Sequence, residues 1–382
     1  VSHQWTMPQS NPMTRIKRAL KRGMKLVVID PRRNEMAERA DVHLQVKPGE
    51  DASLLACMIR EVIENVWYDA DYVANYVSGF EALYDAVKPF TLDYTERRTT
   101  CSAADIVEAA RIFATAASGV AASGTGLHMA RHQNLATQLV QTFNALCGRF
   151  DRRGGMTRIP GTLGPTLPDS GNQPLPVSLR TGQWSRMRNI QGITGLFGYQ
   201  EMPTNTLTDE ILTPGKGQIR ALIVNGGNPA LVFSDTEHTL KALDDLDLLV
   251  VNDLFMSATA KHADYVMAIK HPFERVDIPM LSDNYYPFSF SQYTEKMVEA
   301  EDDVIEEWEL FWKLAQRMDS GFSLPGIPAE ANPEADDVIR ALTPDARITL
   351  DELKAAPPSG QAYDDRIPDV GGVIPDMIGY AD

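Results

Sequence analysis

The pattern of hydrophobic and polar positions is clearest over residues 26–51. Leu26–Ile29 is a continuous apolar run, as expected for a strand that is buried on both faces of a parallel sheet. Asp30 ends this run. Residues 33–40 fit one short helix, and residues 42–46 alternate apolar and polar side chains with the period of a half-buried strand. The pattern therefore predicts a strand–helix–strand unit.

The polar residues that flank this unit are candidates for binding. An acidic side chain at the carboxyl end of a buried parallel strand is where doubly wound folds bind a ribose or a base. Asp30 has that position, although an Asp is also a common turn former. After the second strand, Pro48-Gly49 predicts a turn, and we expect Asp51 to cap the helix that follows.

The same stretch recurs 223 residues later in the chain. Residues 26–47 and 249–270 align without a gap and are identical at 8 of 22 positions, with Asp30 matched to Asp253. The spacing from this Asp to a following Ala-Asp pair is the same in both copies. Because the period is too long for a solenoid, the repeat predicts two related α/β domains, each with an acidic strand end. Convergent strand–helix–strand composition is the alternative explanation.

Further elements follow from periodicity and capping signals. We expect helices over residues 12–22, 51–66, 69–77, 133–147, 234–243 and 306–318, a helix that begins at a capping box at Ser102, and strands over residues 119–123 and 221–224. Ser234 is the expected capping-box residue of the helix over 234–243. Residues 149–195 have many Gly and Pro residues and little periodicity, which predicts a crossover between domains. The Pro-, Asp- and Ala-rich sequence from Gly326 onward predicts a loosely ordered linker.

The predicted fold class is α/β, with two doubly wound, Rossmann-like domains that have mostly parallel sheets and are related by pseudo-two-fold symmetry. The expected boundaries are residues 1–160 for the first dinucleotide-binding domain, 161–215 for the crossover, 216–322 for the second dinucleotide-binding domain and 323–382 for the linker.

Charge and cysteine content exclude several classes of function. The net charge of −16 argues against general affinity for nucleic acid or an anionic membrane, although Lys and Arg are concentrated in the first 33 residues. The three cysteines are far apart and form no CxxC, so an iron–sulfur cluster or a thiolate zinc site within this chain is not expected. No apolar run is long enough to span a bilayer. Because the chain begins at Val1 with a polar stretch, we expect an excised fragment.

Three glycine-containing turns are candidate phosphate sites. Gly124-Thr125-Gly126 and Gly226-Gly227-Asn228 each follow an expected strand, and Gly49-Glu50-Asp51 begins a helix. Glycines at such turns let backbone amides approach a phosphate, although each turn alone is also explained as a structural turn. None of them matches GxGxxG or a P-loop, so neither an ordinary NAD fold nor an ATPase is supported.

The remaining candidates are weaker. His128 and His132 are four residues apart, but no carboxylate accompanies them as in HExxH, so a metal site is not favoured. Cys147 follows an apolar helix and is expected to be a buried thiol.

With these residues assembled, the chain resembles the molybdopterin oxidoreductases of the dimethyl sulfoxide reductase superfamily. The resemblance covers roughly residues 1–320, and its motifs occur in the family's order and spacing. These motifs are Ile29-Asp-Pro-Arg32, Ala40-Asp41, Pro48-Gly-Glu-Asp51, Gly124-Thr-Gly126, Leu146-Cys-Gly148, Gly154-Gly155, Gly227-Asn-Pro229, Asn252-Asp253, Ala263-Asp264 and Phe273-Glu274.

The resemblance implies a cofactor and a set of residues that bind it. The family holds molybdenum or tungsten through two pterin guanine dinucleotides, one for each α/β domain, as bis(molybdopterin guanine dinucleotide). The residues implied for the first dinucleotide are Asp30, Pro31, Arg32, Arg33, Asn34, Gly49, Glu50 and Asp51. Those implied near a pterin or phosphate are Gly124, Thr125, Gly126 and Met129. Those implied for the second dinucleotide are Gly227, Asn228, Asn252, Asp253 and Arg275.

The resemblance also implies an activity and partners. We expect the central part of an oxidoreductase that performs oxo-transfer or two-electron redox chemistry on a small molecule, with electron-transfer subunits as expected partners. The family's iron–sulfur region and protein ligand to the metal are expected upstream of this sequence, so we expect the chain alone to be inactive. The expected location is cytoplasmic, with the periplasm as the alternative.

Two other readings of the sequence stay open. Large subunits of respiratory complexes keep this fold without molybdenum and serve as scaffolds. A different doubly wound enzyme that uses NAD or thiamine diphosphate would also fit the fold class, although its GxGxxG or GDG signature is not found. Metal and pterin analysis would distinguish a scaffold from an enzyme.

Overall fold

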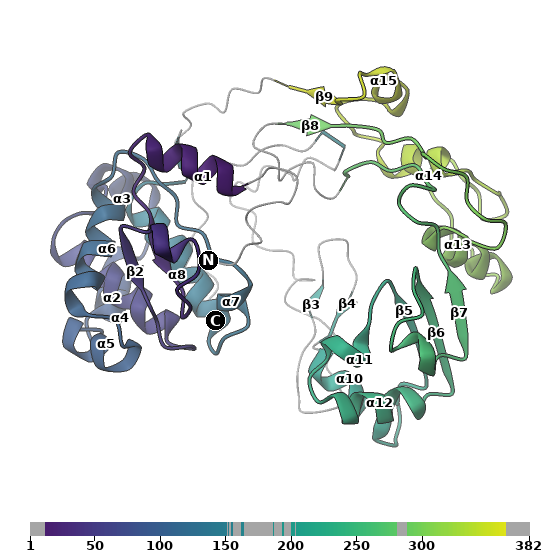
Figure 1. Ribbon diagram of the computed structural model, residues 1–382, viewed down its shortest axis with the longest axis horizontal. Helices are drawn as coiled ribbons and strands as arrows, with labels where there is room; N and C mark the ends of the chain where they lie inside the picture. The colour runs from purple at the N-terminus through teal and green to yellow at the C-terminus, as the bar shows by residue number, and fades with distance from the viewer. Residues whose placement is uncertain are drawn as a thin grey trace. The chain divides into compact units, whose positions relative to one another are not determined.

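The computed structural model describes residues 12–150, 152, 154–155, 162–163, 186, 193–194, 200–202, 204–280 and 289–363. The described residues fall into two compact units, one within Val1–Arg158 and the other within Ile159–Asp365. Each unit is α/β and contains a parallel sheet (Figure 1). The predicted crossover over residues 149–195 lies largely outside the described residues.

The first unit is mostly helical around a short parallel sheet. Its elements are α1 (Pro12–Lys21), β1 (Val27–Ile29), η3 (Ala37–Arg39), β2 (Val42–Leu44), α2 (Asp51–Glu64), α3 (Ala70–Tyr76), α4 (Phe80–Val87), α5 (Leu92–Thr99), α6 (Ala103–Thr115), α7 (Thr125–His128) and α8 (Gln133–Leu146). Strand β1 pairs with β2 in parallel, with Val28 opposite His43. Helix α2 is the centre of the core, because it packs against α4, α5, α6 and α8 and its Leu54 and Ile59 are fully buried.

The second unit is built on a three-stranded parallel sheet in the order β5-β6-β7 (Figure 1). Its elements are β3 (Ile193–Thr194), β4 (Gln200–Glu201), η4 (Thr204–Thr206), α10 (Leu207–Leu212), β5 (Ala221–Asn225), α11 (Pro229–Val232), α12 (Thr236–Asp244), β6 (Leu248–Asp253), η5 (Ala260–His262), β7 (Tyr265–Ala268), β8 (Phe290–Ser291), α13 (Glu307–Arg317), α14 (Ala335–Leu342), α15 (Leu350–Ala355) and β9 (Gln361–Ala362). Strands β3 and β4, and strands β8 and β9, form antiparallel pairs. Val224, Leu249 and Val251 face α12 and form the core of the sheet with Leu243.

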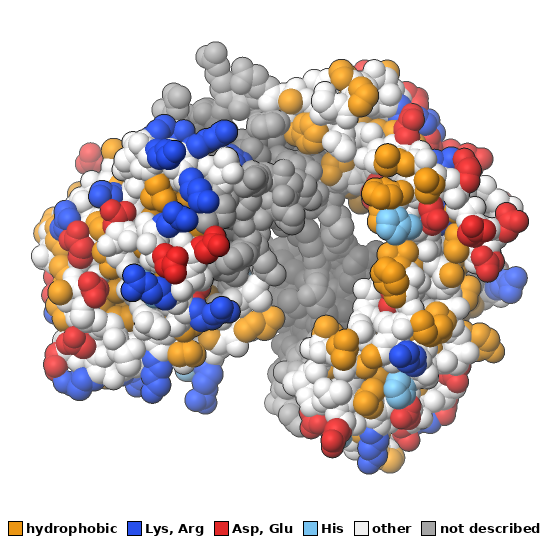
Figure 2. Space-filling view, viewed as in Figure 1, with side chains coloured by type: hydrophobic (Ala, Val, Ile, Leu, Met, Phe, Trp, Pro, Cys, Tyr) orange, Lys and Arg blue, Asp and Glu red, His pale blue; other side chains and the backbone are white. Residues whose placement is uncertain are grey.

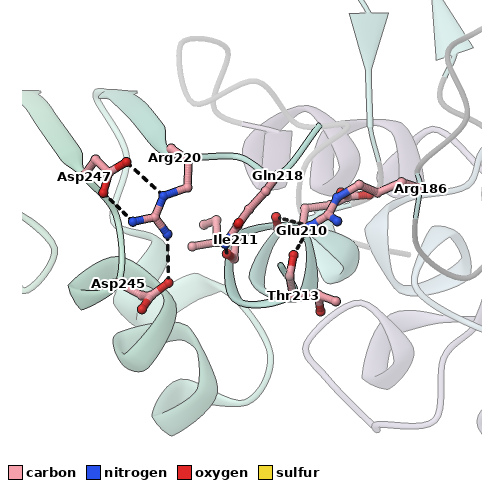
Figure 3. A network of polar contacts seen from close by, with 8 residues as sticks. All are labelled: Arg186, Glu210, Ile211, Thr213, Gln218, Arg220, Asp245 and Asp247. Carbon is pink, nitrogen blue, oxygen red and sulfur yellow. Dashed lines mark hydrogen bonds and ion pairs between the residues drawn. The ribbon is translucent and has the colours of Figure 1, made fainter. Parts of the chain in front are cut away.

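The amino end of this sheet is fixed by an ion-pair network (Figure 3). Arg220, which precedes β5, donates from Nε to Asp247 Oδ2 at 2.9 Å and from Nη1 to Asp245 Oδ2 at 3.0 Å. The amide of Asp247 donates to the carbonyl oxygen of Arg220 at 2.8 Å. Nearby, Arg186 donates from Nε to Glu210 Oε2 at 2.7 Å. The contacts of Arg220 join the start of β5 to the start of β6 at the amino end of the sheet. The candidate binding residues lie at the opposite, carboxyl end of these strands.

Several expectations about local structure are wrong. Residues 33–40 form the single 3-10 turn η3 in place of a helix, because Asn34 Oδ1 accepts hydrogen bonds from the amides of Met36 and Ala37 and closes a tight turn. Asp51 is the first residue of α2 and does not cap it; the N-cap is Glu50, which makes no side-chain cap hydrogen bond. Helix α12 is capped by Asp235, and Ser234 precedes the cap.

Residues 119–123 form no strand, although their backbone is paired. Asn144 is fully buried, its Oδ1 accepts from the amide of Ala121 at 2.8 Å, and its Nδ2 donates to the carbonyl oxygen of Ala121 at 2.8 Å. One side-chain amide therefore supplies the hydrogen bonds that a neighbouring strand would supply.

Residues 327–363 are also more ordered than expected. Helix α14 begins with a capping box of Glu334 and Asp337, and α15 begins with one of Thr349 and Glu352. Helix α14 packs on α13 through Trp312, whose indole donates to the carbonyl oxygen of Ala331 at 2.9 Å. None of the helices in the described part of the chain combines the length and apolarity needed to cross a bilayer.

Candidate functional site

The turn after β1 is held by the carboxylate of Asp30. Its Oδ1 accepts from the amide of Arg32 at 2.7 Å, and its Oδ2 accepts from Nδ2 of Asn34 at 3.0 Å. Asn34 in turn accepts through its Oδ1 from the amides of Met36 and Ala37 at the start of η3. The predicted residues Asp30 and Asn34 are therefore brought together, and the turn that they form has a fixed shape.

Side chains in and directly after β2 fix the same turn. His43 donates from Nε2 to the carbonyl oxygen of Asp30 at 2.9 Å, and Gln45 donates from Nε2 to the carbonyl oxygen of Pro31 at 2.9 Å. Arg32–Arg33 is exposed at the tip. Two guanidinium groups are thus presented at the carboxyl end of a parallel strand, where they can meet an anion.

The start of α2 adds two carboxylates with opposite behaviour. Gly49 adopts φ 90°, a conformation that favours glycine. Glu50 accepts two hydrogen bonds from Arg98, each 2.8 Å, and this guanidinium holds the pKa of Glu50 below its usual range. Burial raises the pKa of Asp51, and the negative charge of Asp30 raises it further. The Glu50 carboxylate is therefore already paired with Arg98. The half-buried carboxylate of Asp51 would instead be stabilised by a hydrogen-bond donor from a ligand.

The third predicted turn of the first unit is a single helical turn. Gly124 is the N-cap of α7 in an extended conformation, and Thr125 begins the helix. A Cβ at Gly126 would meet no atom within 4 Å, and Met129 is 80% exposed. This turn has open space beside its backbone.

The two histidines near α7 have different surroundings. His128 Nε2 lies 3.4 Å from Ser123 Oγ, and His132 is the left-handed N-cap of α8 with φ 58°. Among the residues that the structure describes, no group of three His, Cys, Asp or Glu side chains could hold a metal ion. Cys147 is buried, as expected.

In the second unit, the turn after β5 is fastened to the loop after β6. Gly226 adopts φ 60° and donates from its amide to the carbonyl oxygen of Asn252 at 2.9 Å. Asn228 Oδ1 accepts from the amide of Thr259 at 3.1 Å and from its hydroxyl at 2.8 Å. Gly227 lies between these two anchors and is half-buried. The side-chain oxygen of Asn228 is therefore occupied by a structural role, which leaves its Nδ2 as the group that can contact a ligand.

The carboxyl end of β6 presents an amide and a carboxylate. Asn252 is fully buried, donates from Nδ2 to Asn225 Oδ1 at 3.3 Å, and has an Oδ1 with no hydrogen-bond partner among the described residues. Asp253 Oδ1 accepts from the amides of Leu254 at 2.8 Å and Phe255 at 3.3 Å. An unsatisfied buried acceptor beside a carboxylate favours a ligand that carries N–H or O–H donors.

The two acidic turns share one backbone-to-carboxylate hydrogen bond. In each, Oδ1 of the strand-end Asp accepts from the amide two residues later, Arg32 for Asp30 and Phe255 for Asp253. Each turn is followed by a 3-10 helix, η3 or η5, at the same offset of 223 residues. We call residues 30–34 with 49–51 the first carboxyl edge, and residues 225–228 with 252–257 the second carboxyl edge.

Arg275, like the predicted residues of the turn at 124–129, lies in neither carboxyl edge. Its Nη2 lies 3.5 Å from Asp277 Oδ2, and its Nε is buried without a partner among the described residues. No hydrogen bond or ion pair of the described residues links it to Asn252 or Asp253. Its assignment to the second dinucleotide stays a prediction.

Sequence reasoning missed several residues that shape the two edges. Asn225 and Thr259 hold the second carboxyl edge, and His43, Gln45 and Arg98 hold the first. The alternation in β2 indicated that His43 and Gln45 share a face. Nothing local in the sequence connects Thr259 to Asn228, because the contact joins residues 31 positions apart.

In α/β proteins that bind nucleotides, acidic and amide side chains typically lie beside glycine turns at the carboxyl ends of parallel strands. The profile described as "Molybdopterin oxidoreductase" matches residues 6–317. The chain therefore belongs to the molybdopterin oxidoreductase family, and the resemblance seen in the sequence is confirmed.

Known proteins similar to the chain have different activities. It is 29% identical over 338 residues to the acetylene hydratase of Syntrophotalea acetylenica, covering 83% of this chain and 45% of that protein. It is 28% identical over 365 residues to the F420-dependent formate dehydrogenase subunit alpha of Methanocaldococcus jannaschii, covering 89% of this chain and 50% of that protein. The solved structure of the acetylene hydratase from Pelobacter acetylenicus superposes with a TM-score of 0.66 at 27% identity, covering 81% of this chain and 45% of that one. The chain thus spans about half the length of the curated relatives that it matches.

Proposed function

We propose that this chain binds two molybdopterin guanine dinucleotides, one at each carboxyl edge, that together hold one molybdenum or tungsten ion. In this proposal the two units are doubly wound, Rossmann-like domains related by a pseudo-two-fold axis. The reaction class is oxo transfer or two-electron redox chemistry on a small molecule.

The observation that carries this proposal is the matched pair of acidic turns. Asp30 and Asp253 occupy equivalent positions in a 223-residue repeat and accept a hydrogen bond from the equivalent amide. A duplicated site is what a cofactor with two equivalent halves requires. Membership of the molybdopterin oxidoreductase family supports the same conclusion.

The residues present fit such a group. A Cβ at Gly49, Gly126 or Gly226 would meet no atom within 4 Å, so a phosphate can approach the backbone at all three turns. Arg32 is exposed at the first carboxyl edge and supplies positive charge for a diphosphate. The unpartnered Oδ1 of Asn252 at the second carboxyl edge is an acceptor for a donor of the nucleotide.

The chain's own residues bind and orient the cofactor. When bound, molybdopterin supplies the dithiolene-held metal at which redox chemistry takes place. Asp30 and Asp253 accept hydrogen bonds from guanine or ribose donors, and the glycine turns donate backbone N–H groups to phosphate oxygens. The hydrogen bonds that already fix both acidic turns keep the geometry preorganised, which reduces the entropy lost on binding.

We further propose electron-transfer subunits as partners and a cytoplasmic location. The support for partners is the name of one relative, an F420-dependent formate dehydrogenase subunit alpha.

Cofactor content tests the proposed function. Protein carrying Asp30→Ala or Asp253→Ala, purified from a host that makes the cofactor, is expected to contain less than half of the unmodified protein's molybdenum or tungsten and guanine per chain. Glu299→Ala is the matched control, because Glu299 is an exposed carboxylate with 82% of its side chain accessible. Full metal and guanine content in both variants would refute the proposal. The absence of metal and pterin from the unmodified protein would favour a scaffold instead.

A further inference from the structure

The two acidic turns have the same backbone scheme but opposite side-chain chemistry. At the repeat offset of 223, Arg32 corresponds to Phe255 and Arg33 to Met256. Phe255 is 75% exposed and Met256 is 61% exposed. The two edges therefore present cations and apolar groups, respectively, at equivalent positions beside an equivalent carboxylate.

More exposed apolar side chains lie on α11, which follows the turn at residues 225–228. Leu231 and Val232 of α11 are 71% and 72% exposed. The amide of Ala230 donates to Thr259 Oγ1 at 3.0 Å, and this bond fastens α11 to the loop that carries Phe255. Figure 2 shows hydrophobic side chains at the surface of this unit.

Phe255 lies beside a carboxylate that can recognise a base, because its amide donates to Asp253 Oδ1 at 3.3 Å. Asp253 uses Oδ1 for the turn, and its Oδ2 has no partner among the described residues. A guanine base has N–H donors on one edge and flat apolar faces, so it can donate to Asp253 while one face lies on an aromatic ring. Such a contact is favourable for an exposed phenylalanine, because stacking of the base on the ring removes both apolar surfaces from water.

We propose that Phe255 is the stacking platform for the guanine base at the second carboxyl edge, whereas the first carboxyl edge holds its nucleotide through the charge of Arg32. This inference rests on the proposed function and assigns the two halves of the cofactor different modes of recognition. The second carboxyl edge is specific for a planar base, and the first is sensitive to the negative charge of the nucleotide.

The test uses guanosine diphosphate and inorganic pyrophosphate as probes. Binding to the full chain is measured by calorimetry in the Arg32→Ala background, which removes the charge that holds the nucleotide at the first carboxyl edge. Phe255→Ala is expected to weaken guanosine diphosphate binding about tenfold, and Phe255→Trp to keep it within about twofold. Pyrophosphate binding should not change. Phe311→Ala is the matched control, because Phe311 is 43% exposed on α13.

The outcomes separate this inference from the proposed function. If Phe255→Ala binds guanosine diphosphate normally while Asp253→Ala does not, stacking is refuted and the dinucleotide site stands. If Phe255→Trp weakens binding as much as Phe255→Ala and both lower the melting temperature, Phe255 has a structural role and the inference fails. If the unmodified chain neither binds guanosine diphosphate nor carries guanine after purification, the proposed function fails together with the inference.

Discussion

Asp264 and Leu249 hold each other by a pair of hydrogen bonds at the amino end of β6. The carboxylate Oδ2 of Asp264 accepts from the amide of Leu249 at 2.7 Å, and the amide of Asp264 donates to the carbonyl oxygen of Leu249 at 2.9 Å. In the first unit, Asp41 and Leu26 make the same two bonds, each at 2.8 Å. The Asp of each Ala-Asp pair therefore joins two parallel strands by hydrogen bonds. These bonds lie at the opposite end of the strands from the proposed binding edges.

Removal of the Asp264 carboxylate should destabilise the second unit. Asp264→Ala is expected to lower the free energy of unfolding by about 2 kcal/mol, because the amide of Leu249 loses an ionised acceptor. Asp264→Asn keeps an oxygen at the same position and should lose less than half as much. Urea unfolding followed by circular dichroism measures both values. Equal losses in the two variants would show that the charge, and not the acceptor position, is what matters.

The two carboxylates at the start of α2 should have opposite effects on stability as the pH changes. Arg98 lowers the pKa of Glu50, so Glu50 stabilises the fold above its ordinary pKa of 4.5, and this contribution is lost as the pH falls through the lower pKa of the folded state. Glu50→Gln is therefore expected to destabilise the protein at pH 7 by no more than about 1 kcal/mol, since Arg98 is half-exposed, and to have no effect at strongly acidic pH.

For Asp51 the change of stability with pH has the opposite sign. Burial raises its pKa, so its favourable contribution is complete below the ordinary value of 3.8 and is lost as the pH rises through the raised pKa. Asp51→Asn is expected to stabilise the protein at pH 7 by about 0.5 kcal/mol, and the gain should disappear at acidic pH. Urea unfolding at a series of pH values checks both variants. A loss of stability in Asp51→Asn at pH 7 would contradict this assignment.

The three cysteines should be inert in the folded protein. Burial raises the pKa of Cys57 to about 11 and that of Cys147 to about 12, and it also raises the pKa of Cys101. Because the thiolate is the reactive form, a thiol reagent at pH 8 should modify these residues at least about tenfold more slowly in buffer than in 8 M urea. Absorbance of the released chromophore gives the rates. Rapid native modification of any one cysteine would show that its surroundings open.

The sequence predicted best the strands that a short stretch of residues determines. The apolar runs and the Asp and Ala-Asp positions predicted β1, β6 and their parallel partners, because burial and turn chemistry act over a few residues. It failed where distant side chains replace local pairing. Asn144 satisfies the backbone of Ala121, so small residues that suggested a strand need no sheet.

Composition misled the prediction for the sequence after Gly326. Many Pro and Asp residues suggested a linker, yet the same stretch contains the capping boxes Glu334–Asp337 and Thr349–Glu352. The candidate residues of the two edges were found because strand ends are visible in a sequence. The contacts that fix them were not found, because Arg98 reaches Glu50 from 48 residues away.

Asn228 should be the residue on which the shape of the second carboxyl edge depends most strongly. Its Oδ1 accepts from both the amide and the hydroxyl of Thr259, which is fully buried. Asn228→Ala leaves both donors without an acceptor, so we expect the free energy of unfolding to fall by about 2 to 3 kcal/mol. Asn228→Asp is the matched control, because it keeps an oxygen where the hydrogen bonds form, and it should lose clearly less. Urea unfolding gives the difference, and equal stability of Asn228→Ala and the unmodified protein would show that this contact does not hold the edge.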